Sequence, residues 1–334
     1  MLGKGNPRSG IRLVIWLGAC ALAALVNPAA AADKVRVGKA VPTAFTFTPL
    51  DVGTREGVFA KYGTDVEIIN FTGDAKLQQA LTAGEIEFGL GSGPGMAFAV
   101  KGVPARAVAA YFGAPANIAV LVKDDSPIKK VSDLKGKIMA VSTVGSLTSW
   151  LTQRISIQEG WGKDGIRIVA TGGGPAMNSA ILTNAVDAGM GSYETGLTLQ
   201  EQHRAKPLVT MDKYAPRFIT HVIFARNQLI DGKPQEVANF VKGFFATLDY
   251  MRQHRTQTVA IAQEVLHESN TVMSQAFDRE MPIMSKDGEF DPVALKIIKD
   301  SWVELKTLDA VPSDDQILTR RFVPVKFESA SGAR

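Results

Sequence analysis

Short apolar stretches alternate with amphipathic stretches along most of the chain. The apolar stretches are rich in β-branched residues and bounded by glycine, which predicts strands at residues 35–38, 66–71, 86–91, 106–111, 118–123, 138–141, 166–170 and 186–190. The amphipathic stretches predict helices at residues 50–62, 75–83, 146–160 and 175–183. Strands separated by helices predict an α/β fold with mostly parallel sheets, in which ligands bind at the loops that follow the strands.

The pattern changes after a further strand predicted at residues 219–225. Residues 234–254 carry apolar side chains at three-and-four spacing, which predicts one long amphipathic helix. Further helices are predicted at 259–266, 271–284 and 292–308, the last with Asp291 as its N-cap and Pro292 at its first position. A helical segment this small needs a sheet to pack on, so we expect it to return to the first part of the fold.

These elements predict two lobes with a ligand-binding cleft between them. Residues 32–115 and 227–334 are expected to form the first lobe, and residues 116–226 the second. Strands near 118–123 and 219–225 are expected to cross between the lobes. Closure about this hinge would bury a ligand against the loops of both lobes.

Residues 1–31 have the order of regions that is typical of a secretory signal peptide. Lys4, Arg8 and Arg12 accompany the uncharged apolar run 13–26, and residues 29–32 are alanines that offer a small-residue cleavage site. The apolar run is too short to span a bilayer. Cys20, in the sequence Leu-Gly-Ala-Cys, also permits processing as a lipoprotein, so a lipid-anchored form stays open beside the soluble periplasmic form.

Charge and cysteine content exclude several classes of function. Lys and Arg number 37 against 33 Asp and Glu, and three of the basic residues lie in the signal segment, so the remainder is nearly neutral. This balance gives no support to nucleic-acid or anionic-membrane binding. Cleavage at the alanines would remove the single cysteine, which would exclude disulfides, zinc–thiolate sites and a cysteine nucleophile.

Several short motifs follow one another along residues 35–324. They are VRVG at 35–38, PL at 49–50, REGVFAKYG at 55–63, ALTAGEIEFG at 80–89, DSPI at 125–128, SDLKGK at 132–137, VSTVGS at 141–146 and VDAG at 186–189. In order and spacing they resemble those of the nitrate/sulfonate/taurine class of periplasmic substrate-binding proteins, which includes NMT1-like members. The chain departs from the class pattern at Lys39, Thr64 and Glu87.

This resemblance implies a two-lobed type II periplasmic binding protein fold and a function in transport. The implied protein is a receptor that binds a small organic anion, such as a sulfonate, taurine, a nitrate-like ion or a carboxylate, and delivers it to an ABC permease with a cytoplasmic ATPase. It implies a monomer without catalytic residues, metal or cofactor. Two alternatives stay open: an enzyme on the same fold, such as a pyrimidine-precursor synthase or a small lyase, and a periplasmic sensory module.

Three turns between a strand and a helix are predicted to contact the ligand. In residues 142–148, unpaired amides at the helix start and the hydroxyls of Ser142, Ser146 and Thr148 would bind an anion, and Gly145 would let the backbone approach. The alternative is that Ser146 is an ordinary N-cap.

The second turn contains Gly174, for which the alternative is that the glycines only make the loop flexible. The third turn contains Ser92 and Gly93.

The remaining predicted contacts lie near two other strand ends. Lys39 is a rival position for a ligand's negative charge, and the loop with Thr43 and Phe45 offers a hydroxyl and a ring, although Phe45 is equally compatible with the core. Tyr193 and Glu194 are expected to close the cleft wall, with Glu194 suited to an amine. His221, on the predicted strand 219–225, is expected to be a satisfied strand histidine.

Overall fold

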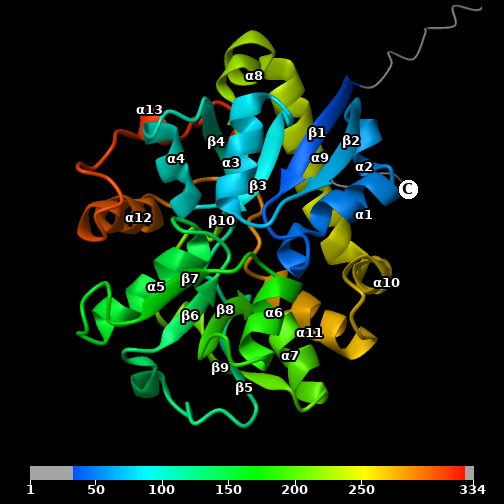
Figure 1. Cartoon of the computed structure of the whole chain (residues 1–334). Coiled ribbons are helices and arrows are strands. Elements are labelled where there is room, and N and C mark those ends of the chain that lie inside the picture. The colour runs from blue at the N-terminus through cyan, green and yellow to red at the C-terminus, as the bar shows by residue number, and fades with distance from the viewer. Residues whose placement is uncertain (1–32, 328–334) are drawn as a thin grey trace, which may run out of the picture. The chain divides into compact units, whose positions relative to one another are not determined.

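The computed structural model describes residues 33–327, so the predicted signal segment and Cys20 lie outside the described residues. The described chain contains two five-stranded sheets flanked by helices (Figure 1). The first sheet has the spatial order β2 (Thr64–Asn70), β1 (Asp33–Lys39), β3 (Phe88–Ser92), β10 (His221–Arg226) and β4 (Ala105–Phe112). The second has the order β7 (Arg167–Ala170), β6 (Ile138–Val141), β8 (Ala188–Ser192), β5 (Ile118–Lys123) and β9 (Ala205–Thr210).

In each sheet one strand runs against the other four. β10 pairs antiparallel with β3 and β4, and β5 pairs antiparallel with β8 and β9, whereas the other neighbours pair parallel. The prediction of mostly parallel α/β sheets is therefore confirmed. Each reversed strand directly follows a passage of the chain between the sheets, at residues 113–117 and 211–220.

The predicted crossing strands therefore each lie within one sheet, and the passages precede them. Residues 221–226 pair in the first sheet, although the predicted second lobe extends to residue 226. The lobe limits themselves stay a prediction.

The helices follow the predicted order, with some divisions and additions. They are η1 (Phe45–Phe47), α1 (Pro49–Arg55), α2 (Val58–Lys61), α3 (Asp74–Ala83), η2 (Pro94–Met96), α4 (Ala97–Val100), η3 (Val131–Leu134), α5 (Leu147–Gln158), α6 (Pro175–Leu182), α7 (Tyr193–Glu201), η4 (Met211–Lys213), α8 (Asn227–Gly232), α9 (Pro234–Gln253), α10 (Arg255–Leu266), α11 (Asn270–Glu280), α12 (Pro292–Glu304) and α13 (Asp314–Ile317). The helix predicted at 50–62 is divided because Gly57 has φ 64°, in the left-handed region that ends a helix.

The long helix α9 covers the first sheet, as expected for the C-terminal segment. It packs against α1 and α2, and the ring of Phe240 stacks on Phe59 at 5.6 Å and on Phe88 at 4.1 Å. The C-terminal segment also contacts the second half, since Trp150 Nε1 on α5 donates to Ser301 Oγ on α12 at 2.6 Å. The Asp291 cap of α12 is confirmed by its bonds from the amides of Val293 and Ala294.

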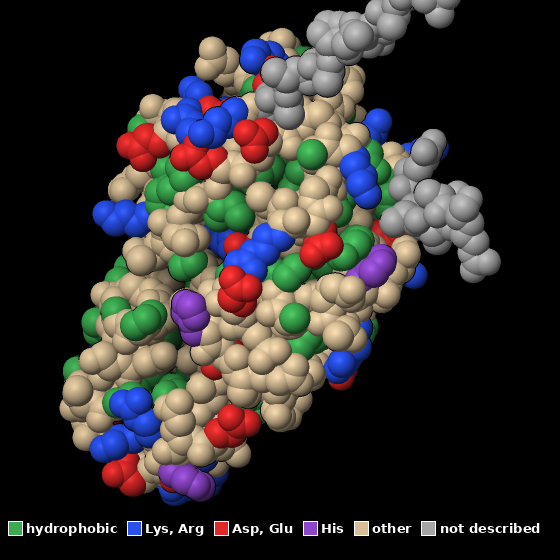
Figure 2. Space-filling view, turned by 90° about the vertical axis from the view of Figure 1, so that its right-hand side faces the viewer, with side chains coloured by type: hydrophobic (Ala, Val, Ile, Leu, Met, Phe, Trp, Pro, Cys, Tyr) green, Lys and Arg blue, Asp and Glu red, His purple; other side chains and the backbone are tan. Residues whose placement is uncertain are grey.

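Basic and acidic side chains are interspersed on the face shown in Figure 2. Ion pairs of the protein surface include Arg55–Glu264 at 2.7 Å and Arg255–Asp278 at 2.8 Å. This arrangement agrees with the balanced composition. Along residues 33–327, none of the helices is both long enough and apolar enough to cross a membrane.

Candidate binding cleft

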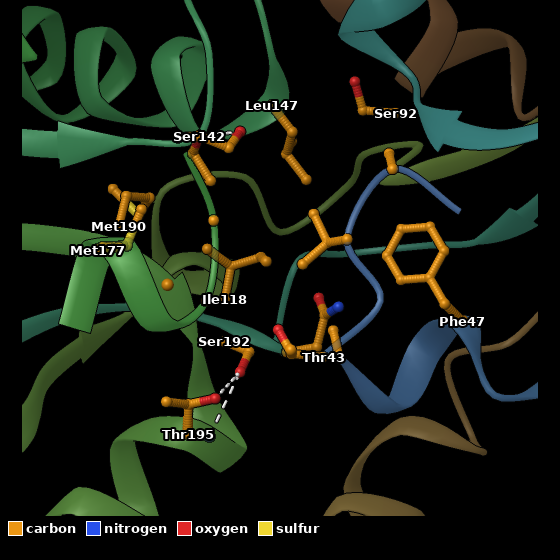
Figure 3. A pocket seen from close by; sticks show the side chains of 18 of the residues that line it. Thr43, Phe47, Ser92, Ile118, Ser142, Leu147, Met177, Met190, Ser192 and Thr195 are labelled. Carbon is orange, nitrogen blue, oxygen red and sulfur yellow. Dashed lines mark hydrogen bonds between the residues drawn. The ribbon is translucent and has the colours of Figure 1, made fainter. Parts of the chain in front are cut away.

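A cleft lies between the two sheets, at the carboxyl ends of their parallel strands (Figure 3). Thr43, Phe47 and Ser92 line it from the first half, and Ser142 and Met177 from the second. The cavity within the cleft is small, at about 50 Å³. The two halves therefore lie close together around it.

The residues that were predicted to bind ligand divide into two groups. Those that line the cleft are Thr43, Ser92, Ser142, Thr148 and Gly174. Those outside its lining are Lys39, Phe45, Gly93, Gly145, Ser146, Tyr193 and Glu194.

The three hydroxyls of the first predicted turn bond to one another. Ser142, Ser146 and Thr148 form a triangle in which each oxygen pair is 3.0 Å apart. Ser146 is 1% exposed. It caps α5 by accepting from the Ser149 amide at 3.5 Å and donates to the Thr143 carbonyl at 2.7 Å. Ser146 thus supports the turn from behind, while Ser142 and Thr148 face the cleft.

A carboxyl group from the first half faces the start of α5. Asp74, the first residue of α3, has Oδ2 3.4 Å from the amide nitrogen of Leu147. Asp74 also accepts hydrogen bonds from the amide of Ser92 at 2.9 Å and from its hydroxyl at 2.8 Å. Burial raises the pKa of Asp74 in spite of these bonds. The helix-start amide that was predicted to meet an anionic ligand therefore already meets a carboxyl group of the opposite half.

The turn before α6 presents backbone amides to the cleft that do not donate to a carboxyl group of the opposite half. Gly173 and Gly174 line the cleft, and among the described residues their N–H groups have no hydrogen-bond acceptor. Gly174 has φ 59°, which disfavours any side chain with a β-carbon. A β-carbon there would also lie 3.2 Å from Thr43 Oγ1 of the opposite half. Glycine at this position lets the two halves approach each other.

Lys39 is buried inside the first half. Its side chain is 2% exposed, and Nζ pairs with the carboxylate of Asp51 on α1. Burial lowers the pKa of Lys39, while the charge and hydrogen bond of Asp51 act in the opposite direction. The positive charge is therefore matched by an internal partner.

The other outlying residues have structural positions. A β-carbon on Gly93 would lie 2.0 Å from the carbonyl oxygen of Ile219, so this glycine allows close backbone packing. Gly145 lines a separate surface hollow beside Trp150. Phe45 is fully buried in the core, which is the alternative that the sequence left open. Tyr193 begins α7, with the Arg279 guanidinium 4.5 Å from its ring centre.

Glu194 belongs to a buried group of carboxyls between the halves. Its Oε1 accepts from the amide of Phe45 at 2.9 Å, and it is 1% exposed. Glu280 on α11, which packs against α7, is equally buried. Burial first, and then the charge of Glu194, raises the pKa of Glu280 well above its ordinary value. Burial also raises the pKa of Glu194.

Replacing Glu280 with glutamine is expected to change how stability depends on pH. Because the folded-state pKa of Glu280 is raised, its contribution is fully present below the ordinary value of 4.5 and is lost as pH rises through the folded pKa. The free energy of unfolding of Glu280→Gln, relative to the unaltered protein, should therefore increase between pH 4.5 and 8. Urea unfolding across this range measures the difference.

A difference that stays constant across this range would contradict a raised pKa at Glu280.

The sequence did not single out the polar residues Asp74 and Asn117, and it indicated His221 as a strand histidine; all three line the cleft. Asp74 follows β2 at a strand-to-helix turn, so the signal used for the other turns was present there too. Asn117 and His221 lie in or directly after the passages between the sheets. In the described part of the chain, no set of three or more His, Cys, Asp or Glu side chains is placed to hold a metal ion.

Two mixed α/β sheets with a cleft at the carboxyl ends of their strands define the periplasmic binding protein fold. A family model described as NMT1/THI5 like matches residues 44–258, and the chain belongs to this family.

Individual relatives agree with this assignment. The chain is 23% identical, over 89% of each sequence, to a protein of Bacillus subtilis (strain 168) named as an aliphatic sulfonates-binding protein. The alkanesulfonate-binding protein SsuA from Xanthomonas axonopodis pv. citri, solved with MOPS bound, superposes with a TM-score of 0.73 at 16% identity, covering 85% of this chain and 96% of that one. The desulfurization enzyme DSZB superposes with a TM-score of 0.62 at 15% identity, covering 87% and 97%. At these identities the two structures establish the shared fold alone.

Proposed function

We propose that this chain is an extracytoplasmic receptor that binds a small organic anion and delivers it to an ABC importer. The observation that carries the proposal is a cleft whose walls come from both halves, in a member of this family. The names of the Bacillus and Xanthomonas proteins favour a sulfonate as the ligand. The receptor would act as a monomer in the periplasm, soluble or lipid-anchored at Cys20, and its partners would be a permease and its ATPase.

Closure of the cleft would report that the ligand is bound. Contacts between the halves, such as Asp74 with the Leu147 amide and Glu194 with the Phe45 amide, exist only when the halves are together. A ligand that touches both walls shifts the equilibrium toward this closed form by the difference between its affinities for the two forms. A transporter that recognises the closed form would thereby select loaded receptors.

Neutral donors would bind the anionic head of the ligand. Among the described residues, neither lysine nor arginine lines the cleft. The hydroxyl of Ser142 already donates to Ser146, so the available donors are the hydroxyls of Thr43 and Thr148 and the amides of Gly173 and Gly174. Amides at a helix start favour negative charge without a counter-ion. Binding without a full positive charge also suits a ligand that must later be released.

An enzyme on the same fold is the alternative, because the desulfurization enzyme DSZB shares this architecture. The two functions differ in what becomes of the ligand. A receptor returns its ligand chemically unchanged, whereas an enzyme converts it. Nuclear magnetic resonance of a sulfonate recovered after long incubation with the protein distinguishes them.

Replacing Gly174 with valine is expected to weaken sulfonate binding at least tenfold. The new side chain would meet Thr43 across the cleft and cover the free amides before α6. A tenfold loss corresponds to about 1.4 kcal/mol. Isothermal titration calorimetry with butane-1-sulfonate measures the affinity. In thermal unfolding, this probe at 100 times its dissociation constant should stabilise the unaltered protein by about 2.7 kcal/mol.

Gly172 offers a matched control in the same turn. It also has positive φ, at 81°, but a β-carbon there would have no atom closer than 3.9 Å, and Gly172 does not line the cleft. Gly172→Val should share the backbone strain while retaining affinity within about threefold, or about 0.7 kcal/mol. Equal losses in both variants would mean that backbone strain, and not ligand contact, explains the effect of Gly174→Val.

A further inference from the structure

Two buried polar side chains on the cleft have atoms without hydrogen-bond partners. Asn117 lies in the first passage between the sheets, and His221 is the first residue of β10, directly after the second passage. Both line the cleft, and they are 0% and 4% exposed. Among the described residues, no atom meets the full geometry of a hydrogen bond to Asn117 Oδ1 or to His221 Nδ1, although the backbone of Gly91 lies near enough to the imidazole to oppose the lowering of its pKa. Folded proteins leave few buried polar atoms without a hydrogen-bond partner. Two neighbouring side chains with such atoms on a cleft therefore indicate a role beyond packing.

The two side chains are close enough to act together. Asn117 Nδ2 lies 3.5 Å from His221 Nε2. If the Asn117 amide donates to Nε2 of His221, the single proton of the neutral imidazole is on Nδ1. The Nδ1–H donor of His221 and the Oδ1 acceptor of Asn117 are then both unpaired. If the Asn117 side-chain amide is flipped, the Nε2–H group of His221 donates to Asn117 Oδ1. The Nδ1 acceptor of His221 and the NH2 group of Asn117 are then unpaired. In either orientation at least one donor and one acceptor remain free.

The surroundings keep this pair uncharged. The imidazole lies among aromatic rings, with ring-centre distances of 4.9 Å to Phe47, 5.7 Å to Tyr111 and 5.7 Å to Phe112. Burial lowers the pKa of His221 to about 3, so the imidazole is neutral at physiological pH. A neutral pair recognises an uncharged group that both donates and accepts a hydrogen bond, rather than an anionic head.

We propose that Asn117 and His221 bind an uncharged hydrogen-bonding substituent of the ligand, such as a hydroxyl or a carboxamide. The cleft would then prefer an organic anion with such a substituent over a plain aliphatic anion of the same length. This inference rests on the proposed function, in which the cleft binds a small organic anion. The anionic head is assigned there to the hydroxyls of Thr43 and Thr148 and the amides of Gly173 and Gly174, so the two ends of the ligand have separate binding groups.

The preference is tested with two matched probes, butane-1-sulfonate and 4-hydroxybutane-1-sulfonate. Calorimetry on the unaltered protein should show the hydroxylated probe binding at least tenfold more tightly. In His221→Phe, which keeps a ring among the aromatic side chains, and in Asn117→Leu, the ratio of the two affinities should fall below threefold. A merely structural role of the pair would leave this ratio unchanged and would contradict the inference.

A second measurement does not depend on the choice of probe. Removing unpaired polar atoms from a buried site relieves their desolvation, so the double variant Asn117→Leu, His221→Phe should unfold without ligand at the same temperature as the unaltered protein or higher. A fall of several degrees would show that the pair is structural and would overturn the assignment. Binding of both probes without preference contradicts this inference alone, whereas failure to bind either probe contradicts the proposed sulfonate receptor and the inference with it.

Discussion

Replacing Lys39 with methionine is expected to lower the free energy of unfolding by about 3 kcal/mol and to leave ligand affinity unchanged. The substitution leaves the carboxylate of Asp51, whose side chain is 13% exposed, without its cation inside the first half. Removal of one partner from a buried ion pair is more costly than removal of both, because the remaining charge is neither solvated nor paired. Urea unfolding gives the stability, and calorimetry on the folded variant gives the affinity for butane-1-sulfonate.

The double variant Lys39→Met, Asp51→Leu is the matched control. It removes both charges and should recover most of the lost stability. A Lys39→Met protein with normal stability and no ligand binding would instead place Lys39 at the ligand. That outcome would support Lys39 as the position for the ligand's negative charge, which the sequence left open beside the turn at residues 142–148.

Replacing Gly93 with alanine is expected to lower the free energy of unfolding by about 3 kcal/mol. The added methyl group would lie 2.0 Å from the carbonyl oxygen of Ile219, and backbone cannot move aside as a flexible side chain can. The amide of Gly93 also donates to the Thr220 carbonyl at 3.0 Å, so the clash would disturb the passage between the sheets just before His221. Chemical unfolding measures the effect.

Gly232, at the end of α8, is the control for glycine replacement. A β-carbon there would meet no atom within 4 Å, so Gly232→Ala should change stability by less than about 1 kcal/mol. If the two variants were equally stable, the close approach of Gly93 to Ile219 would be contradicted.

Strand and helix positions followed well from the sequence because most elements are buried on a regular face. β3 and β5 are almost entirely buried and are therefore continuous apolar runs. β9 was missed because it is an edge strand with Pro207 and few buried residues, so its pattern is that of a loop. The direction of a strand leaves no mark in such a pattern, and the reversal of β5 and β10 became visible only in the structure.

The candidate site was predicted at the level of loops rather than of side chains. Ligand-facing turns follow parallel strands, and Ser92, Ser142 and Gly174 lie in or next to such turns on the cleft. Which side chains of a turn face the cleft depends on packing from distant segments. Gly93 faces Ile219 and Ser146 faces its own turn for this reason. His221 lay on a correctly predicted strand, but its unpaired nitrogen depends on neighbours that the sequence does not reveal.

The pairing of β10 between β3 and β4 bears on the order in which the chain can fold. β4 cannot join β1, β2 and β3 in the first sheet until β10 is available, and β10 is synthesised after every strand of the second sheet. Contacts this distant along the chain form slowly, because the intervening segment must be organised first. In a chain that crosses a membrane before it folds, this topology would postpone completion of the first sheet until residues 221–226 have followed.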